Sequence, residues 1–77
     1  MNTIETIVQL IYELTERDDI QINKSLAKQL HEIDFTRLVL YIEEYFWLEL
    51  TDEILREYDT VQKLAEFIDA DTMNQIN

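Results

Sequence analysis

EIDFTRLVLYIEEYFW, residues 32 to 47, is the stretch that decides the fold. Its apolar residues recur at helical spacing, so they predict one buried stripe. The expected members of that stripe are Ile33, Leu38, Val39, Ile42 and Phe46. The opposite side carries charges and an unusual share of aromatics, namely Asp34, Phe35, Arg37, Tyr41, Glu44, Tyr45 and Trp47. The sequence therefore predicts a central helix whose outer surface carries charged and aromatic side chains.

The composition points to one small helical domain. The chain has 77 residues, of which 47% are hydrophobic and 30% charged, too apolar and too well patterned for a disordered tail. Glycine and proline are both absent, and with them the usual residues of tight hairpins and phosphate-binding loops. We therefore expect residues 1–77 to form a single all-α domain, a small antiparallel bundle of three main helices plus one short helix.

A first helix is expected ahead of the central one. It should run from Thr3 to about Arg17, with Thr3 as its N-cap and Thr6 as a second choice. Its buried stripe comprises Ile4, Ile7, Val8, Ile11 and Leu14, with Leu10 and Tyr12 at the edges. This amphipathic pattern predicts that the helix packs against the central one.

The helical pattern breaks over residues 18–25, which indicates a long loop. Ile20 and Ile22 are expected to tuck under it as a small apolar cluster, because isoleucines left in water would forfeit their burial. Asn23 or Ser25 can then cap a short helical turn just before the central helix.

Two more helices are expected after the central one and an extended connector. Thr51 or Asp52 opens a short helix, and Asp59 or Thr60 caps the last helix. The inward side chains are expected to be Ile54, Leu55 and Tyr58 in the short helix and Val61, Leu64, Ala65 and Ile68 in the last, with Phe67 at the edge. The tail, residues 69–77, is polar and is expected to fray.

The charge of the chain narrows the choice of partners. Seventeen acidic and six basic residues give a net charge of −11, which repels nucleic acids and anionic membranes. A basic protein partner is the natural complement, although the acidity can equally serve only to keep a small protein soluble. Cysteine is absent, and neither a membrane-spanning run nor a signal peptide is evident, so we expect a soluble, cytoplasmic protein.

Few residues here could carry out catalysis or bind a metal. One serine, one histidine and no cysteine leave little for a nucleophile and base, so no enzymatic activity and no catalytic residue is expected. His31 is expected to be a surface residue at a helix start. The acidic pairs Asp18-Asp19, Glu43-Glu44 and Asp69 with Asp71 could attract calcium or magnesium weakly, but solvated charge is the preferred interpretation and no metal site is expected.

From Leu38 to Ile68 the chain reads LVLYIEEYFWLELTDEILREYDTVQKLAEFI. This run resembles the acyl and peptidyl carrier proteins without a gap. The matching features are an apolar pair, then Glu43-Glu44 and Phe46, a connector from Leu50 to Asp52, and Thr60-Val61-Gln62 at the start of the last helix. The resemblance implies carrier-protein topology: a long helix, a long loop, the central helix, a short helix and a final helix.

Carrier proteins hold a phosphopantetheine arm on a serine at the start of the central helix, within a Gly-x-Asp-Ser-Leu sequence. In the register set by the Leu38 pair, Glu32 occupies the serine position and Ile33 that of the leucine. A carboxylate cannot take the arm through a phosphodiester, so the resemblance implies a carrier-like protein without a cofactor. The alternative is a genuine carrier with 4'-phosphopantetheine on Ser25, which shifts the attachment about two helical turns toward the N-terminus.

In carrier proteins the outer face of the central helix meets partner enzymes, so the resemblance implies docking to a protein. The expected partner-binding residues are Glu32, Ile33, Asp34, Arg37, Leu40, Tyr41, Glu43, Glu44, Tyr45 and Trp47. Arg37 stands where an acidic residue is common in the family, which suggests a different or specialised partner.

The function expected from these observations is a non-catalytic carrier-like protein that docks to a biosynthetic enzyme or another subunit. It would be an accessory or regulatory part of a fatty-acid, polyketide or nonribosomal peptide type system, and a monomer or weak homodimer. A second alternative is a homodimeric interaction module that uses Tyr41, Tyr45 and Trp47. Such rings can also simply cover the edge of a bundle.

Overall fold

The computed structural model describes residues 2–74 of the chain. Within them the helices are α1 (Thr3–Thr15), α2 (Leu26–Gln29), α3 (Glu32–Phe46), α4 (Asp52–Glu57) and α5 (Val61–Asn74). Three are long and two are short, so the predicted all-α bundle with three main helices is confirmed. Among the described residues no helix has the length and apolar content that crossing a membrane requires.

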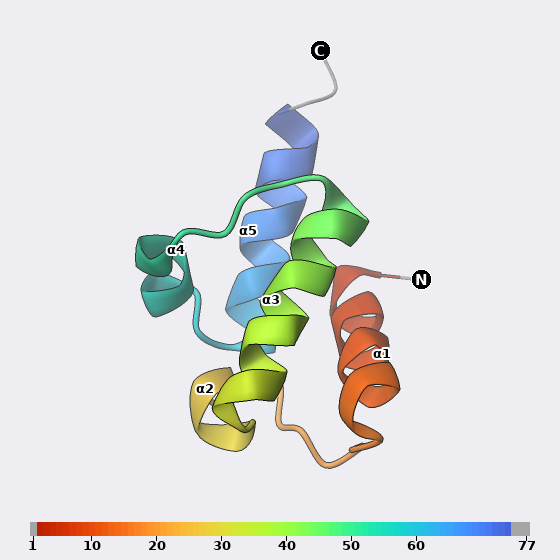
Figure 1. Cartoon of the computed structure of the whole chain (residues 1–77). Coiled ribbons are helices and arrows are strands. Elements are labelled where there is room, and N and C mark those ends of the chain that lie inside the picture. Colours follow the sequence, from red (N-terminus) through yellow and green to blue (C-terminus); the bar gives the residue numbers. More distant parts are fainter. Residues whose placement is uncertain (1, 75–77) are drawn as a thin grey trace.

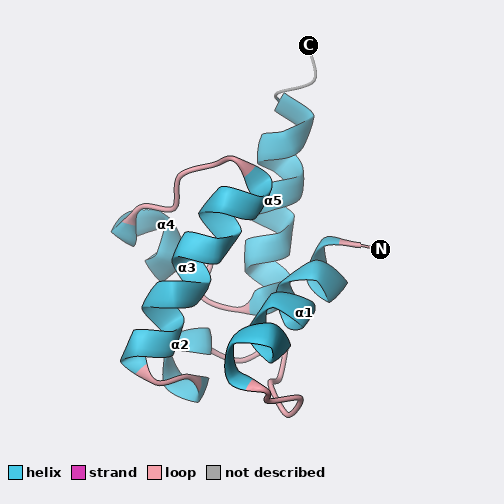
Figure 2. Cartoon of the chain, turned by 45° about the vertical axis from the view of Figure 1, so that its right-hand side comes forward, coloured by secondary structure: helices cyan, strands magenta, loops and turns pink. Residues whose placement is uncertain are grey.

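The three long helices lie side by side, and α1 packs against both α3 and α5 (Figure 1). The N-terminal helix α1 runs in the direction opposite to α3 and α5. The last two run in the same direction because the connector and α4 return the chain from the end of α3 to the end of the molecule where α3 begins. The view turned by 45° shows the same arrangement, with α2 below the start of α3 and α4 to its side (Figure 2). The central helix α3 therefore has α1 on one side and the short helices α2 and α4 near another.

The cap residues of α1 differ from the prediction. Asn2, not Thr3 or Thr6, is the N-cap, and its side-chain oxygen accepts a hydrogen bond of 2.8 Å from the Glu5 amide. The helix ends at Thr15 instead of about Arg17, because Glu16 adopts a left-handed conformation with φ of 60°. In a chain without glycine a larger residue must take that position at some cost in conformational energy.

The other caps follow the sequence closely. The Thr51 hydroxyl accepts from the Ile54 amide at 3.2 Å, and the Thr60 hydroxyl accepts from the Lys63 amide at 3.0 Å. Ser25 precedes α2 without a capping hydrogen bond from its side chain. The threonine caps place α4 and α5 where their apolar residues can reach the core.

One core joins all the long helices. Its buried members are Ile7, Ile11, Leu26, Leu30, Leu38, Ile42, Leu50, Val61, Leu64, Ala65 and Ile68. The predicted inward residues of α5 are all buried, and those of α4 pack half-buried against the core. In α3, Leu38 and Ile42 are buried as predicted, but Ile33 is 66% exposed, so its assignment to the stripe is wrong.

The loop before α2 and the first residue of α2 are joined to the start of α5, a segment distant in sequence, through two backbone hydrogen bonds. The Leu26 amide donates to the Asp59 carbonyl at 2.8 Å, and the Gln62 amide donates to the Ile22 carbonyl at 3.0 Å. Ile20 packs against the core as expected, whereas the side chain of Ile22 is 37% exposed and does not tuck under the loop. The backbone of residue 22 is used instead of its side chain.

The last helix is longer than its apolar pattern. α5 continues to Asn74, so residues 69–74 of the predicted tail are helical in the structure, and residues 75–77 lie outside the described part. Thr3 donates a side-chain hydrogen bond to Asp69, which joins the first turn of α1 to this extension. Whether these last turns open in solution stays a prediction.

Candidate docking surface

The outer face of α3 carries an exposed row of residues, which we call the outer stripe. Its members are Ile33, Arg37, Leu40, Tyr41, Glu44 and Trp47. The first five follow one another at intervals of four, three, one and three residues, which places them on one face of the helix. Ile33 is 66% exposed, Leu40 52% and Tyr41 43%. All six side chains are exposed, and Leu40 lies at the edge nearest the connector and α4.

Trp47 ends the outer stripe and is the most exposed large residue in it. It is the C-cap of α3, in a left-handed conformation with φ of 55°, and its amide donates to the Glu43 carbonyl. This turn directs the indole away from the core, and 86% of the residue is exposed. Glu43, Glu44 and Trp47 line an open hollow of about 300 Å³. The hollow therefore combines an aromatic surface with two carboxylates.

The two neighbouring glutamates have different tasks. Glu43 is half-buried, and its carboxylate accepts a hydrogen bond of 2.9 Å from the Leu50 amide, so it holds the connector after α3. Glu44 is exposed and belongs to the outer stripe. Beside them, Tyr45 is 59% exposed and its ring packs edge-on against Phe46, with 4.9 Å between the ring centres.

At the other end of α3, Glu32 is the exposed first residue of the helix. Its backbone carbonyl accepts from the Thr36 hydroxyl at 3.0 Å, and its carboxylate lies in the first turn, where the helix dipole favours negative charge. His31 is the N-cap without a capping side-chain hydrogen bond, and Asp34 is half-buried. Ser25 is half-buried and precedes α2, so it does not lie at the start of α3.

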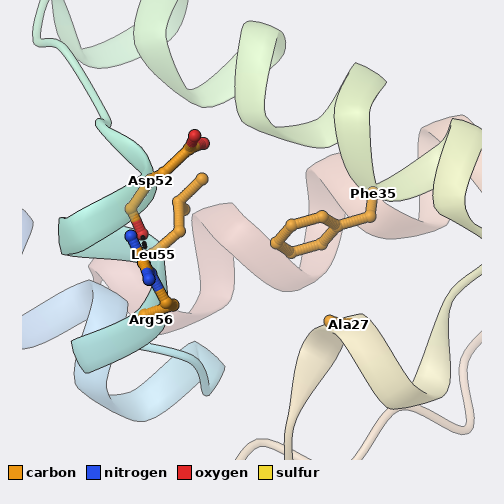
Figure 3. Close-up of a pocket in the computed structure, with 5 residues that line it drawn as sticks. All are labelled: Ala27, Phe35, Asp52, Leu55 and Arg56. Atoms are coloured by element: carbon orange, nitrogen blue, oxygen red, sulfur yellow. Dashed lines mark hydrogen bonds between the residues drawn. The ribbon is translucent and has the colours of Figure 1, made fainter.

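Phe35 does not belong to the outer surface, contrary to the prediction. It is half-buried and packs against the core from the side of α3 that faces α2 and α4. Two hollows of about 520 and 210 Å³ meet here and share Phe35, Asp52 and Leu55. Figure 3 shows the phenyl ring directed from α3 into the space between Ala27 and Leu55. A groove with a mainly apolar lining, which also includes Asp52 and Arg56, therefore flanks the outer stripe.

The loop ahead of α3 is held by polar contacts that no sequence pattern indicated. The Arg17 guanidinium donates to both carboxylate oxygens of Asp19, at 2.9 and 3.2 Å, and also to the Gln29 carbonyl. This hydrogen bond from Arg17 lowers the pKa of the Asp19 carboxyl below its ordinary value. The Gln29 side chain accepts from the Gln21 amide at 2.8 Å and donates to the Gln21 carbonyl at 2.9 Å. In the sequence, the position of Arg17 two residues before Asp19 is compatible with their ion pair, but nothing there indicates the contacts with Gln29.

The described chain offers no assembled reaction centre. Across residues 2–74, no three or more His, Asp or Glu side chains converge where they could hold a metal ion. Ser25 and His31 sit ahead of different helices, α2 and α3. The most developed surface is therefore the exposed face of α3 with the groove beside it, a geometry suited to contact with another macromolecule.

Comparison with known proteins shows a distant similarity to an acyl carrier protein. No family model matches the chain. An acyl carrier protein from Phytoplasma mali (strain AT) is 33% identical over 55 residues, an alignment that spans 69% of this chain and 66% of the relative, just under two thirds of its length. Together with the helix order, this distant similarity makes the chain acyl-carrier-protein-like.

Proposed function

We propose that this acyl-carrier-protein-like chain lacks the residue that would hold a prosthetic arm and works by docking to a protein partner. It is then a non-catalytic, cytoplasmic accessory or regulatory subunit of a fatty-acid, polyketide or nonribosomal peptide type system. The observation that carries the proposal is the pairing of an exposed α3 face with a glutamate as the first residue of that helix.

The chemistry at Glu32 supports the first half of this proposal. Attachment of the arm requires a hydroxyl oxygen that can attack phosphorus and remain as a phosphodiester. The carboxylate of Glu32 cannot provide this linkage, so the residues at the start of α3 do not fit the group. Ser25, the one serine of the chain, is half-buried and lies before the short helix α2. A genuine carrier with its arm on Ser25 is the alternative.

The charge and the apolar side chains of α3 support docking. A chain of net charge −11 attracts a partner with basic residues, and the hollow of Glu43, Glu44 and Trp47 can accept a cationic side chain against an indole ring. Arg37 lies in the middle of the same face, so an acidic residue at the matching position of the partner would complement it. A partner surface of mixed charge, and not a uniformly basic patch, matches this pattern.

The register is tested by rebuilding the attachment sequence. The variant His31→Asp/Glu32→Ser/Ile33→Leu is incubated with coenzyme A and a broad-specificity phosphopantetheinyl transferase, and its intact mass is measured. We expect the rebuilt variant to gain the mass of one arm and to keep the helical circular dichroism of the wild type. A folded variant that gains nothing would show that Glu32 does not occupy the attachment position.

Docking is tested in native cells with a photo-crosslinking amino acid. The exposed Leu40 is replaced by benzoylphenylalanine, and Glu66, an exposed residue of α5, is replaced in a matched control. We expect an adduct from position 40 whose partner is identified by mass spectrometry and, once purified, binds wild-type protein more tightly than a Leu40→Lys variant. If positions 40 and 66 give the same adducts, or if Leu40→Lys binds equally well, α3 is not the docking face.

A further inference from the structure

The outer stripe has a symmetric chemical pattern. It reads apolar at Ile33, basic at Arg37, apolar at Leu40 and Tyr41, acidic at Glu44 and aromatic at Trp47. Its midpoint falls between Leu40 and Tyr41. At the rise of a helix, Arg37 and Glu44 lie about 5 Å to either side of that midpoint. Apart from the sign of the charges and the larger ring at Trp47, the order of residue types is similar from either end.

This pattern is complementary to itself. When a second copy of α3 lies antiparallel against the first, a twofold axis passes between Leu40 and Tyr41. Arg37 of each copy then lies opposite Glu44 of the other, so two charge pairs form at once. Trp47 comes opposite the first turn of the other helix, where Ile33 is exposed. We propose that a second copy of this chain covers the outer stripe as a symmetric α3–α3 dimer.

The charges of the stripe are available for such pairing. Among the described residues the ion pairs join Arg17 to Asp19 and Lys63 to Asp59, and neither Arg37 nor Glu44 has a partner in the described part of the chain. Within one helix these two residues are about 10 Å apart, too far to pair with each other. The neighbouring Glu43 is occupied by the Leu50 amide, so Glu44 is the carboxylate that faces outward.

The same geometry sets the strength of the dimer. A single helix face from Ile33 to Trp47 is about 21 Å long, which gives an interface smaller than that of a stable complex. Two chains of net charge −11 also repel each other. We expect a weak dimer that forms at high local concentration and then covers the apolar side chains.

The dimer uses the surface that the proposed function assigns to a partner. Self-association and partner docking therefore exclude each other, and the partner must displace the second copy. The inference rests on that surface but not on the identity of residue 32. A mass gain at Ser25 would overturn the proposal that the arm is absent and leave the proposed dimer untouched. A monomeric wild type would overturn the proposed dimer and leave the absence of the arm untouched.

The test is a charge exchange measured by sedimentation equilibrium at about 0.15 M salt, where net repulsion is screened beyond roughly 8 Å. Arg37→Glu puts two glutamates opposite each other in its own dimer, and Glu44→Arg puts two arginines there. Each variant alone should associate at least about tenfold more weakly than the wild type. An equimolar mixture of the two restores both opposite-charge pairs, as does the double variant Arg37→Glu/Glu44→Arg in its own dimer.

Matched controls carry the same charge changes elsewhere. Lys63→Glu and Glu66→Arg alter exposed residues of α5, and they should leave self-association within about twofold of the wild type. Circular dichroism confirms that every variant is folded. Three results would overturn the dimer: a wild type that stays monomeric at millimolar concentration, single variants that associate as well as the wild type, or a mixture that fails to recover association.

Trp47 provides a local readout because it is the one tryptophan of the chain. Its indole is 86% exposed in the single chain and should become less exposed in the dimer. On concentration, the emission of the wild type should shift to shorter wavelength, and that of Arg37→Glu alone should not. Association without any shift in emission would place the contact on another surface and contradict the proposal.

Discussion

The two faces of α3 have similar apolar content but opposite surroundings. On the inner face Leu38 and Ile42 are completely buried, whereas on the outer face Leu40 is 52% and Ile33 66% exposed. The difference does not come from helical propensity, since both faces belong to one continuous helix. It comes from what the rest of the chain covers: α1 and the core bury one face, whereas the side chains of the other face stay largely in water.

This comparison separates two uses of the hydrophobic effect. Burial on the inner face stabilises the fold, while exposed apolar area on the outer face is available for association. A fold of this size has one small core, so every apolar side chain left outside is a loss unless another surface covers it. Substitutions on the two faces and around them test this division.

The largest effect is expected from truncating one residue on each face. Ile42→Ala removes buried methyl groups and leaves a cavity, so it should lower the free energy of unfolding by about 2–5 kcal/mol. Leu40→Ala should lower it by less than about 1 kcal/mol, because half of that side chain is already in water. Urea denaturation followed by circular dichroism measures both. Equal losses would mean that the outer face is covered within the monomer.

A smaller effect should distinguish the two neighbouring glutamates. Glu43→Ala leaves the Leu50 amide without its 2.9 Å hydrogen bond in a partly buried connector, which should cost about 1–2 kcal/mol. Glu44→Ala removes an exposed charge and should change stability by less than about 0.5 kcal/mol. Thermal unfolding of the two variants provides the comparison. A stability loss at Glu44 as large as that at Glu43 would contradict an outward, unpaired Glu44.

The smallest effect concerns the loop that leads into α3. Because Arg17 lowers the pKa of Asp19 in the folded chain, the pair adds stability at pH values above the ordinary carboxyl pKa of 3.8. That contribution is lost as the pH falls through the lower, folded-state pKa.

Asp19→Asn should therefore be slightly less stable than the wild type at pH 7, and the difference should vanish in strong acid. Asp18→Asn, which alters an exposed neighbour, is the matched control for unfolding measured across pH. If both variants show the same pH profile, the Arg17 contact does not act on stability.

Much of this fold could be predicted from the sequence because helical spacing and threonine caps are local signals. Thr51, Thr60 and the buried residues of α5 follow directly from them. The prediction for Ile33 is wrong because helical spacing alone does not fix how wide the buried stripe is, and position 33 lies beyond the edge of that stripe. Phe35 was placed outside for the complementary reason, since its ring is received by α2 and α4, which no periodicity indicates.

The candidate site was less predictable than the fold. The exposed side chains of α3 were anticipated, but their twofold pattern depends on knowing which residues are uncovered. The contacts of Arg17 and Gln29 join residues 12 and 8 positions apart through side-chain and backbone atoms, and such contacts leave no trace in hydrophobic spacing. Long-range polar contacts and the choice of exposed face both require the three-dimensional arrangement.

The central claim is that a carrier-like fold is used here without its prosthetic arm. The most direct measurement is the intact mass of the protein isolated from its native cells, compared with the mass calculated from its sequence. We expect no added phosphopantetheine. An added arm, mapped by peptide fragmentation to Ser25 and absent from a Ser25→Ala variant, would contradict it and make this chain a genuine carrier.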